Sequence, residues 1–428
     1  MILVRAEVEK NIKIVVEEML KKAYVFIFST LIIVLFASCI RSNRVVSISE
    51  NNLFDLDYGN FQEQINLFRL KEQGPVSTSI FMRAGFFYIV NGDSGKIISL
   101  NSYGDLLSLF YSEDFYSDSE HSSLVNSDSG IWKSISYPFT FTGKLAVDSR
   151  KVLYAASNVP KERNEQAEDA SVLYSQVILR ISSDGKEIDY LGQQGPAGTP
   201  FPDIKNIYTT ENNELVVVCS TNKGLEVFWF SSDGFLKYQV PVGVKTIPAN
   251  ALEDEKTNSE ISDFFITIEN IVPDYYAERL YIKVDYYLPH IDEESKTQSG
   301  VDFVKSSVFP LDVSSGRFGE VLDIPAFEES VTEDFSKLTY KIPYDFLGVT
   351  KNTWMYFIIT TEKGFNILML QPGTQNVLRR NIEINHKDTL YYSFSLSDEG
   401  IISALLCGIE NAKVVWWRTD SLLNSVFK

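Results

Sequence analysis

A pattern of short strand-like runs joined by tight polar turns recurs along this chain, and it limits the fold more than any other feature. The clearest copy spans residues 86–109, where the apolar runs 87–90, 96–100 and 106–109 are separated by turns rich in Gly, Asn, Ser and Asp. Turns of this composition join neighbouring antiparallel strands. The stretch therefore predicts a three-stranded antiparallel meander.

Degenerate copies of this meander follow along the chain. In five copies the last two runs are joined by a turn with a glycine: Gly104, Gly185, Gly234, Gly316 and Gly373. Polar insertions explain their unequal spacing, and the basic unit of about 45–50 residues lies in the range of propeller repeats. The units lie at 79–111, 143–192, 204–240, 264–324, 353–380 and 390–417. The sequence thus predicts an all-β fold, a six-bladed β-propeller with one blade from each unit.

The last unit shows only three runs, so its blade needs a strand from elsewhere. Residues 53–68 contain two alternating runs around Gly59 and Asn60, a pattern that predicts a hairpin. This segment can supply the missing outer strand, and closing the ring in this way removes free sheet edges. We therefore expect the propeller to span 51–428, with its two ends meeting in one blade.

Composition excludes some functions. The chain has 428 residues, of which 44% are hydrophobic, and a formal net charge of −18. An acidic surface repels the phosphate backbone, so we expect no nucleic-acid partner. Cys219 and Cys407 lie within apolar runs and outside any C-x-x-C pair. This favours buried, unreactive thiols over the alternative, a disulfide.

The N-terminal part has the shape of a signal peptide. Lys21 and Lys22 precede the apolar run 23–37, which is short for a membrane-spanning helix. The small residue Ser38 and Cys39 follow. An uncleaved signal anchor, in which Cys39 has no role, is the alternative.

The stretch 35–39, Leu-Phe-Ala-Ser-Cys, resembles a bacterial lipobox, although Phe36 departs from the usual leucine. This resemblance implies cleavage before Cys39 and a diacylglycerol on its thiol. Residues 1–38 would then be the lipoprotein signal peptide and 39–50 a tether. Because one lipid chain binds a membrane only marginally, a stable anchor would need multiple acylation.

Met19 offers a second possible start for the chain. It precedes Leu20, Lys21 and Lys22, so a chain that begins there would carry an ordinary signal peptide. Residues 1–18 would then be a mis-assigned extension. The sequence leaves both starts open.

The repeated units resemble those of six-bladed NHL-type propellers. The residues behind this resemblance are Leu-Ala-Val-Asp at 145–148, the connector 192–202 and the Ser-Asp-Gly turns. Segments 53–59, 100–107 and 415–420 resemble, more particularly, a family of spirochaete lipoproteins of unknown function. The resemblance implies a lipid-anchored protein of the cell envelope and no particular activity.

Catalytic patterns are missing from the sequence. The histidines His121, His290 and His386 are scattered, whereas lyases related to NHL propellers need several near the axis. No nucleophile elbow, zinc-protease, Walker or dinucleotide pattern is present. We therefore predict no catalytic residue, no metal ligand and no cofactor, and we expect no enzyme. Trp416 and Trp417 are expected in the core rather than on an exposed binding platform.

One acidic cluster needs an interpretation. Asp285, Asp292, Glu293 and Glu294 lie near His290, and such a group could bind a cation. No Asp-x-Asp-x-Asp calcium loop is present. A solvated polar loop at 290–300 is the favoured interpretation.

These patterns favour a lipid-anchored envelope protein, periplasmic or surface-exposed, that binds a protein or glycan partner through propeller loops. The alternative is an enzyme with carboxylates at the propeller axis. An enzyme should bring acidic, Arg or His side chains together at a mouth of the channel. A scaffold should show an apolar or aromatic patch on one face.

Overall fold

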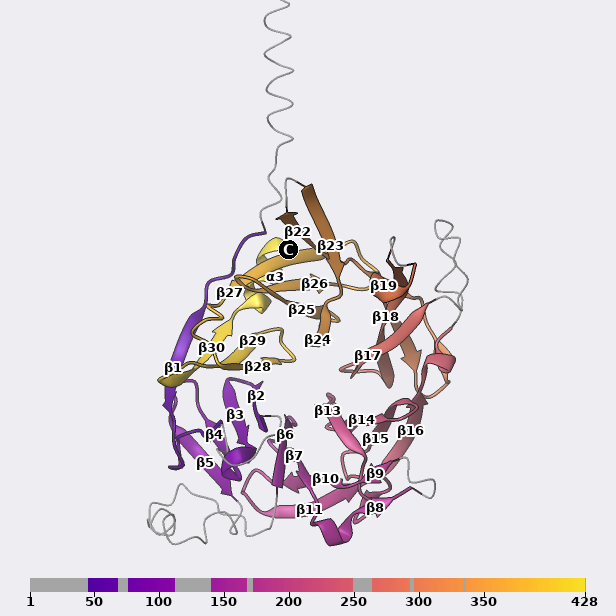
Figure 1. The fold of residues 1–428 in the computed structure, drawn as a ribbon. Helices are drawn as coiled ribbons and strands as arrows, with labels where there is room; N and C mark the ends of the chain where they lie inside the picture. The colour runs from indigo at the N-terminus through magenta and orange to yellow at the C-terminus, as the bar shows by residue number, and fades with distance from the viewer. Residues whose placement is uncertain are drawn as a thin grey trace, which may run out of the picture. The chain divides into compact units, whose positions relative to one another are not determined.

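The computed structural model describes residues 45–67, 76–111, 140–167, 172–248, 264–292, 296–333 and 336–427. Residues 47–428 form one compact unit, in which antiparallel sheets are arranged around a central axis (Figure 1). The predicted six-bladed β-propeller is confirmed. The signal-peptide region lies outside the described residues.

The first three blades follow one another along the chain. Blade 1 consists, from the axis outwards, of β2 (Thr78–Arg83), β3 (Phe86–Asn91), β4 (Lys96–Leu100) and β5 (Leu106–Tyr111), with the 3₁₀ turn η1 (Gly92–Ser94). Blade 2 consists of β6 (Thr140–Val147), β7 (Leu153–Asn158), β10 (Gln176–Ile181), β11 (Glu187–Gly192) and β12 (Gly195–Pro196); η3 (Lys161–Arg163) and the pair β8 (Glu165–Gln166) and β9 (Leu173–Tyr174) lie between β7 and β10 in the chain. Blade 3 consists of β13 (Asp203–Thr209), β14 (Leu215–Thr221), β15 (Gly224–Phe230) and β16 (Leu236–Val242), and η4 (Val244–Thr246) follows it.

The other three blades complete the ring. Blade 4 consists of β17 (Phe265–Pro273), β18 (Arg279–Ile291), β19 (Gln298–Asp312) and β20 (Arg317–Phe318), and β21 (Leu322–Ile324) also pairs with β19. A separate hairpin, β22 (Phe327–Glu333) and β23 (Ser336–Ile342), precedes blade 5, which has β24 (Asp345–Val349), β25 (Met355–Thr361), β26 (Gly364–Leu370) and β27 (Val377–Glu383). Blade 6 consists of β28 (Tyr391–Leu396), β29 (Ile402–Cys407), β30 (Asn411–Trp417) and β1 (Asn51–Asp57), and α3 (Thr419–Val426) follows β30 in the chain.

Strand β1 closes the ring. It pairs antiparallel with β30, and Leu56, opposite Ala412, is almost fully buried. The residues just before β1 contact blade 5, because the backbone N–H of Ile48 donates to the carbonyl of Asn381 at 2.8 Å. The same short segment thus borders blade 5 and then completes blade 6.

The prediction of a hairpin at 53–68 is wrong. Only its first run is a strand, after which the chain turns back and the N–H of Ile65 donates to the carbonyl of Asp57. Ile65 and Leu67 are buried in the apolar cluster between blades 1 and 6. Their alternation with polar residues reflects this burial and not pairing with a neighbouring strand.

The antiparallel order of each blade sorts its connections onto two faces. We call one the turn face: it carries the links between first and second strands, such as 210–214, and those between third and fourth strands, such as 231–235. All of these links are tight turns, and Gly185 and Gly234 adopt there the positive φ that glycine tolerates best. We call the other the insertion face, and β8–β9, β22–β23 and the free end of β18–β19 belong to it.

Blade 4 departs from the expected loop at 290–300. Instead of a polar loop, β18 continues to Ile291 and β19 begins at Gln298, so the two strands form a long hairpin. The pair β22–β23 and helix α3 were also not predicted. Charged residues at exposed positions of these strands conceal their pairing in the sequence.

The core lies between the blades. Strand β14 is buried along most of its length and β25 likewise, as their apolar character on both faces predicts. Trp417 is fully buried, whereas Trp416 is half-buried. Cys219 and Cys407 are buried free thiols in different blades.

The innermost strands leave backbone groups without partners in their own blade, and side chains of neighbouring blades fill this need. The contacts are Ser79 Oγ to Gly143 O (2.6 Å), Thr209 Oγ1 to Val147 O (3.1 Å), Asn270 Nδ2 to Phe346 O (3.0 Å), Ile80 N to Ser393 Oγ (3.3 Å) and Met82 N to Ser395 Oγ (3.2 Å). Polar residues on the inner strands therefore have a structural role before any other.

Candidate functional site

A polar network crosses the axis at the turn face. Arg83, at the end of β2, donates to the carbonyl of Val147 at 3.1 Å, to the hydroxyl of Thr209 at 3.3 Å and to the hydroxyl of Tyr275 at 3.2 Å. Its guanidinium lies 3.5 Å from the carboxylate of Asp398. These residues belong to blades 1, 2, 3, 4 and 6, so one side chain links five blades.

The charged groups in this network are paired with one another. The side chains of Arg83 and Asp398 are only 12% and 14% exposed, and Tyr275 donates to Asp398 at 2.9 Å. Burial opposes ionisation of Asp398, but hydrogen bonding with Glu399 and the charge of Arg83 outweigh it and lower its pKa. Burial and the adjoining Asp398 raise the pKa of Glu399, which Lys351 contacts at 3.3 Å. The lowered pKa of Asp398 favours a paired carboxylate and not a free base.

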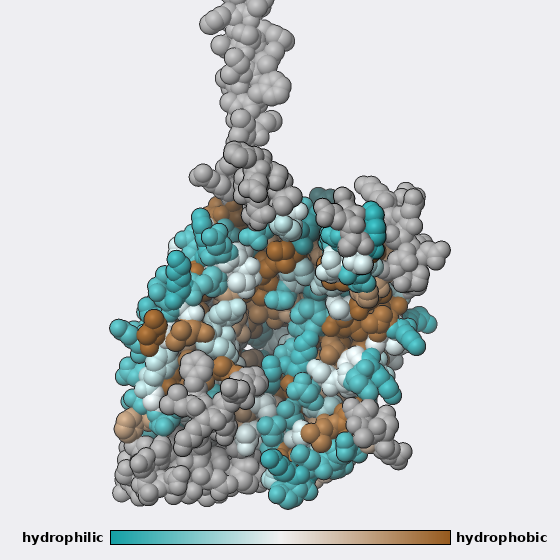
Figure 2. Space-filling view, viewed as in Figure 1, coloured by the Kyte–Doolittle hydropathy of each residue, from teal (hydrophilic) through white to brown (hydrophobic). Residues whose placement is uncertain are grey.

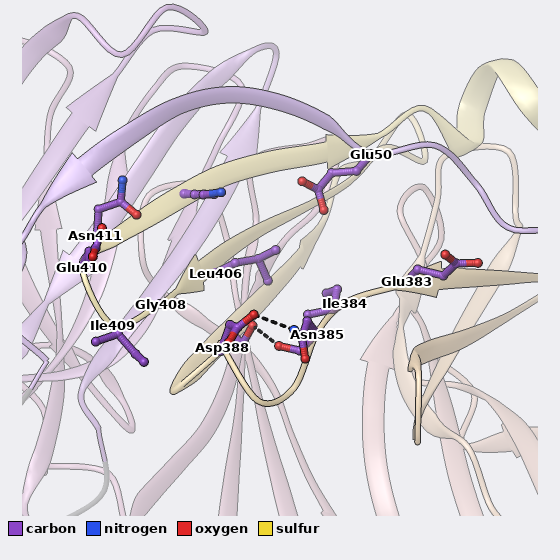
Figure 3. Close-up of a pocket in the computed structure, with 12 residues that line it drawn as sticks. Glu50, Glu383, Ile384, Asn385, Asp388, Leu406, Gly408, Ile409, Glu410 and Asn411 are labelled. Carbon is purple, nitrogen blue, oxygen red and sulfur yellow. Dashed lines mark hydrogen bonds between the residues drawn. The ribbon is translucent and has the colours of Figure 1, made fainter.

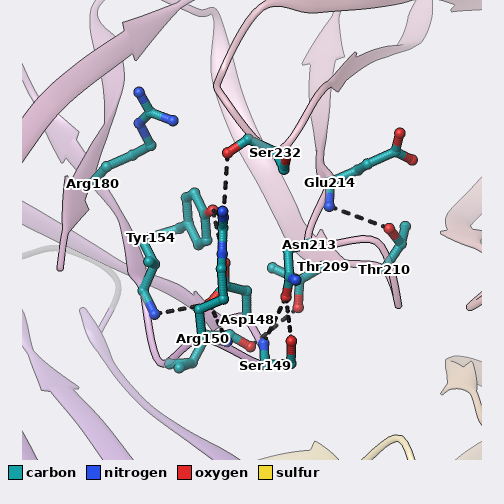
Figure 4. Close-up of polar contacts among 12 residues, drawn as sticks. Asp148, Ser149, Arg150, Tyr154, Arg180, Thr209, Thr210, Asn213, Glu214 and Ser232 are labelled. Atoms are coloured by element: carbon teal, nitrogen blue, oxygen red, sulfur yellow. Dashed lines mark hydrogen bonds and ion pairs between the residues drawn. The ribbon is translucent and has the colours of Figure 1, made fainter. Parts of the chain in front are cut away.

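A second polar cluster adjoins this network between blades 2 and 3 (Figure 4). Asp148 is fully buried, and its Oδ1 accepts from the backbone N–H groups of Arg150 and Val152, each at 2.9 Å. The guanidinium of Arg150 holds the other oxygen at 2.7 Å and also donates to the carbonyl of Ser232 in blade 3 at 3.2 Å. The cluster shapes the turn after β6 and ties two blades together.

The third polar cluster lies between blades 4 and 5. Lys283 is fully buried and donates to both oxygens of Asp285, at 2.7 and 2.8 Å, while Glu269 lies 3.7 Å away. A register shift in the β17–β18 pairing occurs at Glu269, whose carboxylate accepts from the backbone N–H of Phe346 at 3.1 Å. Burial raises the pKa of Glu269 to about 7, and the charge of Lys283 partly offsets that effect. The residue Asp345, at the start of β24, is exposed, but the protein around its carboxyl partly desolvates it and raises its pKa.

Replacement of Glu269 by Gln should reveal this raised pKa. A carboxyl whose pKa is raised from 4.5 to about 7 stabilises the fold below pH 4.5, and the contribution is lost as the pH rises through 7. We therefore expect the free energy of unfolding of Glu269→Gln to rise, relative to that of the native protein, by about 2–3 kcal/mol as the pH increases from 4.5 to 8. Urea unfolding at several pH values measures this difference, and a constant difference would contradict the shift.

The acidic cluster predicted from the sequence does not form one solvated loop. Asp285 is buried against Lys283, which corrects that interpretation, while Glu293 and Glu294 lie outside the described residues. His290 is exposed and lies 2.8 Å from Asp302. Sequence reasoning missed the Lys283–Asp285 pair, although the alternation of these two charged residues within an apolar strand was a usable signal.

The other residues singled out in the sequence lie far apart or outside the described part of the chain. His386 contacts the backbone carbonyls of Thr361 and Gly364, at 2.9 and 3.1 Å. Cys39 and His121 lie outside the described residues. Among the described residues, no group of three or more His, Cys, Asp and Glu side chains could hold a metal ion. The described part of the chain also contains no helix long and apolar enough to cross a membrane.

An acidic groove of about 540 Å³ lies between the end of blade 5 and the outer strands of blade 6 (Figure 3). Its carboxylates are Glu50, Glu383, Asp388 and Glu410, and Lys413 is its single basic residue. Burial raises the pKa of Glu50, and the charge of Lys413 opposes that effect. This lining disfavours anionic ligands such as phosphates.

No family model matches the sequence, and neither does any curated protein. Among the solved structures similar to the chain is a gluconolactonase from Xanthomonas campestris, with 10% identity over 88% of this chain and 99% of that chain (TM-score 0.38). Streptogramin B lyase has 12% identity over 86% and 96% (TM-score 0.33), and the Dos1 propeller has 9% over 87% and 95% (TM-score 0.34). The structural neighbours are six-bladed propeller proteins, and at these identities they do not decide between enzyme and binding protein.

Proposed function

We propose that this chain is a lipid-anchored binding protein of the cell envelope that docks a protein or glycan partner through the insertion face. One observation carries the proposal: the longer described connections, β8–β9, β22–β23 and the free end of β18–β19, all belong to that face. Binding residues are commonly carried on such connections, which a rigid scaffold positions. Tight turns occupy the opposite face.

The axis network supports docking over catalysis at the turn face. An active site there needs an Arg, acid or Tyr group left free for substrate. Arg83, Tyr275 and Asp398 instead bond to one another and to the blades around them. We therefore interpret the network as a structural element that holds the blades together at the axis.

A specific observation favours the alternative, an envelope enzyme. The pKa of Glu269 lies near 7, a value suited to general acid–base catalysis, and its side chain is 24% exposed. Its hydrogen bond with the N–H of Phe346 gives it a structural role as well. If glycan fragments are hydrolysed by the native protein and not by Glu269→Gln, the enzyme alternative replaces docking.

The anchor is tested by following Cys39. We expect the chain, produced in a bacterium with lipoprotein processing, to partition into the detergent phase, and Cys39→Ala to move to the aqueous phase. Mass spectrometry of the N-terminal peptide should show a diacylated Cys39. Detergent partitioning by Cys39→Ala, or an unmodified and uncleaved N-terminus, would refute the lipid anchor.

The docking face is tested by cross-linking in the native envelope. Lys223 and Lys363 lie in turns of the insertion face, whereas Lys151 and Lys186 lie in turns of the turn face, and all four are exposed. We expect a protein partner to cross-link to the first pair and not to the second. Cross-links confined to the turn face would overturn the proposed orientation.

A further inference from the structure

The long hairpin of blade 4 carries an apolar strip on one side. Pairing places Phe265 and Phe303 opposite Tyr287, and Val301 opposite Pro289, while Ile291 is the next residue on this side of β18. We call these residues the apolar strip: Phe265, Tyr287, Pro289, Ile291, Val301 and Phe303. Alternate residues of a strand share one face, so the strip is continuous across β17, β18 and β19.

In the described part of the chain, three residues of this strip are about half exposed, and the other three are half-buried. Phe265 is 47% exposed, Ile291 51% and Val301 49%, although the rings of Tyr287 and Phe303 pack edge to face at 5.7 Å. Figure 2 shows hydrophobic residues gathered over β17–β19, at the right of the view. The other side of the hairpin is polar at the same level, where His290 contacts Asp302.

Acidic residues outnumber basic ones in the sequence of this hairpin. Residues 280–312 contain six acidic and three basic residues, a formal net charge of −3. The sequence between β18 and β19 begins with Asp292, Glu293 and Glu294, and at the other end of the strip Asp345 is exposed at the start of β24. A partner with apolar side chains flanked by basic residues would complement this arrangement.

Two other occupants fit less well. Asp292, the residue that follows β18, opposes insertion of the hairpin into a lipid bilayer, because a charge is costly in hydrocarbon. A second copy of the chain would bring together two acidic hairpins on molecules that each carry a net charge of −18.

We propose that the apolar strip is a docking site for a partner protein segment with apolar residues flanked by Lys or Arg. This inference rests on the proposed function and names the surface and the chemistry of its partner. Burial of the exposed halves of Ile291, Val301 and Phe265 would supply the apolar part of the binding free energy. The excess of acidic residues in this part of the chain would supply orientation and speed of association.

A fluorescent peptide of three leucines with two lysines at each end tests the proposal on the full chain. We expect saturable binding by anisotropy, and at least ten-fold weaker binding by the double variant Ile291→Ser/Val301→Ser. Phe235→Ser is the matched control, since Phe235 is 65% exposed on the turn face, and it should bind as the native chain does. All three substitutions leave the charge unchanged, so a loss reports the apolar contact.

Further arms keep the outcomes distinct. A peptide with Glu in place of Lys should not bind, and Phe265→Ser should repeat the loss if the double variant fails to fold. Equal binding by the double variant and Phe235→Ser would overturn the proposal, because it would show attraction to net charge alone. If the native chain binds phosphatidylcholine vesicles and the double variant does not, the partner of the strip is a lipid surface and not a protein segment. If the native chain dimerises in sedimentation and the double variant does not, the partner is a second copy of the chain. If envelope cross-links to Lys223 and Lys363 persist in the double variant, the strip proposal fails while insertion-face docking stands.

Discussion

Removal of strand β1 is expected to prevent stable folding of the propeller. A chain that starts at residue 58 loses the pairing with β30, the burial of Leu56 and the edge-to-face contact of Phe54 with Phe87 at 5.8 Å. Loss of one buried strand from a closed ring should cost more than about 5 kcal/mol, a large share of the usual stability of a domain. It also leaves β30 as a free, apolar edge that favours aggregation.

Thermal melting of two truncated chains measures this effect. The control starts at residue 45 and keeps β1 together with the contact of Ile48 with blade 5. We expect the control to melt cooperatively and the shorter chain to be unfolded or aggregated. Equal melting temperatures would show that closure by β1 contributes little to stability.

Replacement of Arg83 by Leu is expected to destabilise the protein by about 3–5 kcal/mol, the usual cost of removing one partner of a buried charge pair. The variant leaves the carboxylate of Asp398, 14% exposed, without its cationic partner, and it removes a donor from Val147, Thr209 and Tyr275. Urea unfolding should show this loss. Lys186→Met is the control, because the ion pair of Lys186 with Asp184 is exposed and its removal should change nothing measurable.

The double variant Arg83→Leu/Asp398→Leu distinguishes the cost of an unpaired buried charge from the cost of the other lost contacts. If the cost comes from an uncompensated buried charge, the double variant should be more stable than Arg83→Leu alone. The pKa of Asp398 is lowered in the fold, so its contribution is present at neutral pH and is lost as the pH falls through that lowered pKa. The deficit of Arg83→Leu should therefore shrink in acid. A deficit that is independent of pH would contradict the charge pairing.

Much of the propeller could be predicted from local sequence. Glycines such as Gly185 and Gly234 mark turns that need positive φ, and the apolar run 215–218 marks a strand buried on both sides. Both signals depend only on residues near one another in the chain. For that reason the sequence predicts the blades, with their order and number.

Residues whose partners lie in another blade carried no such signal. Arg83 and Asp398 meet only after blades 1 and 6 come together around the axis. The inner strand β24 was not predicted, because Gly348 and the exposed Asp345 interrupt its apolar pattern. Of the apolar strip, Ile291 lies in the segment expected as a polar loop, whereas Phe265, Tyr287 and Phe303 lie in runs that the sequence predicts as strands.

The sequence by itself determined a ring of six antiparallel blades, since turn chemistry and strand burial are set by short stretches of chain. Only the tertiary structure decided which side chains meet at the axis and which apolar residues remain exposed. Ring closure brings Arg83 and Asp398 together as an ion pair at the turn face. Strand pairing leaves the apolar strip of β17–β19 partly exposed on the insertion side. Each of these depends on which distant residues become neighbours, and a local pattern contains no information on that.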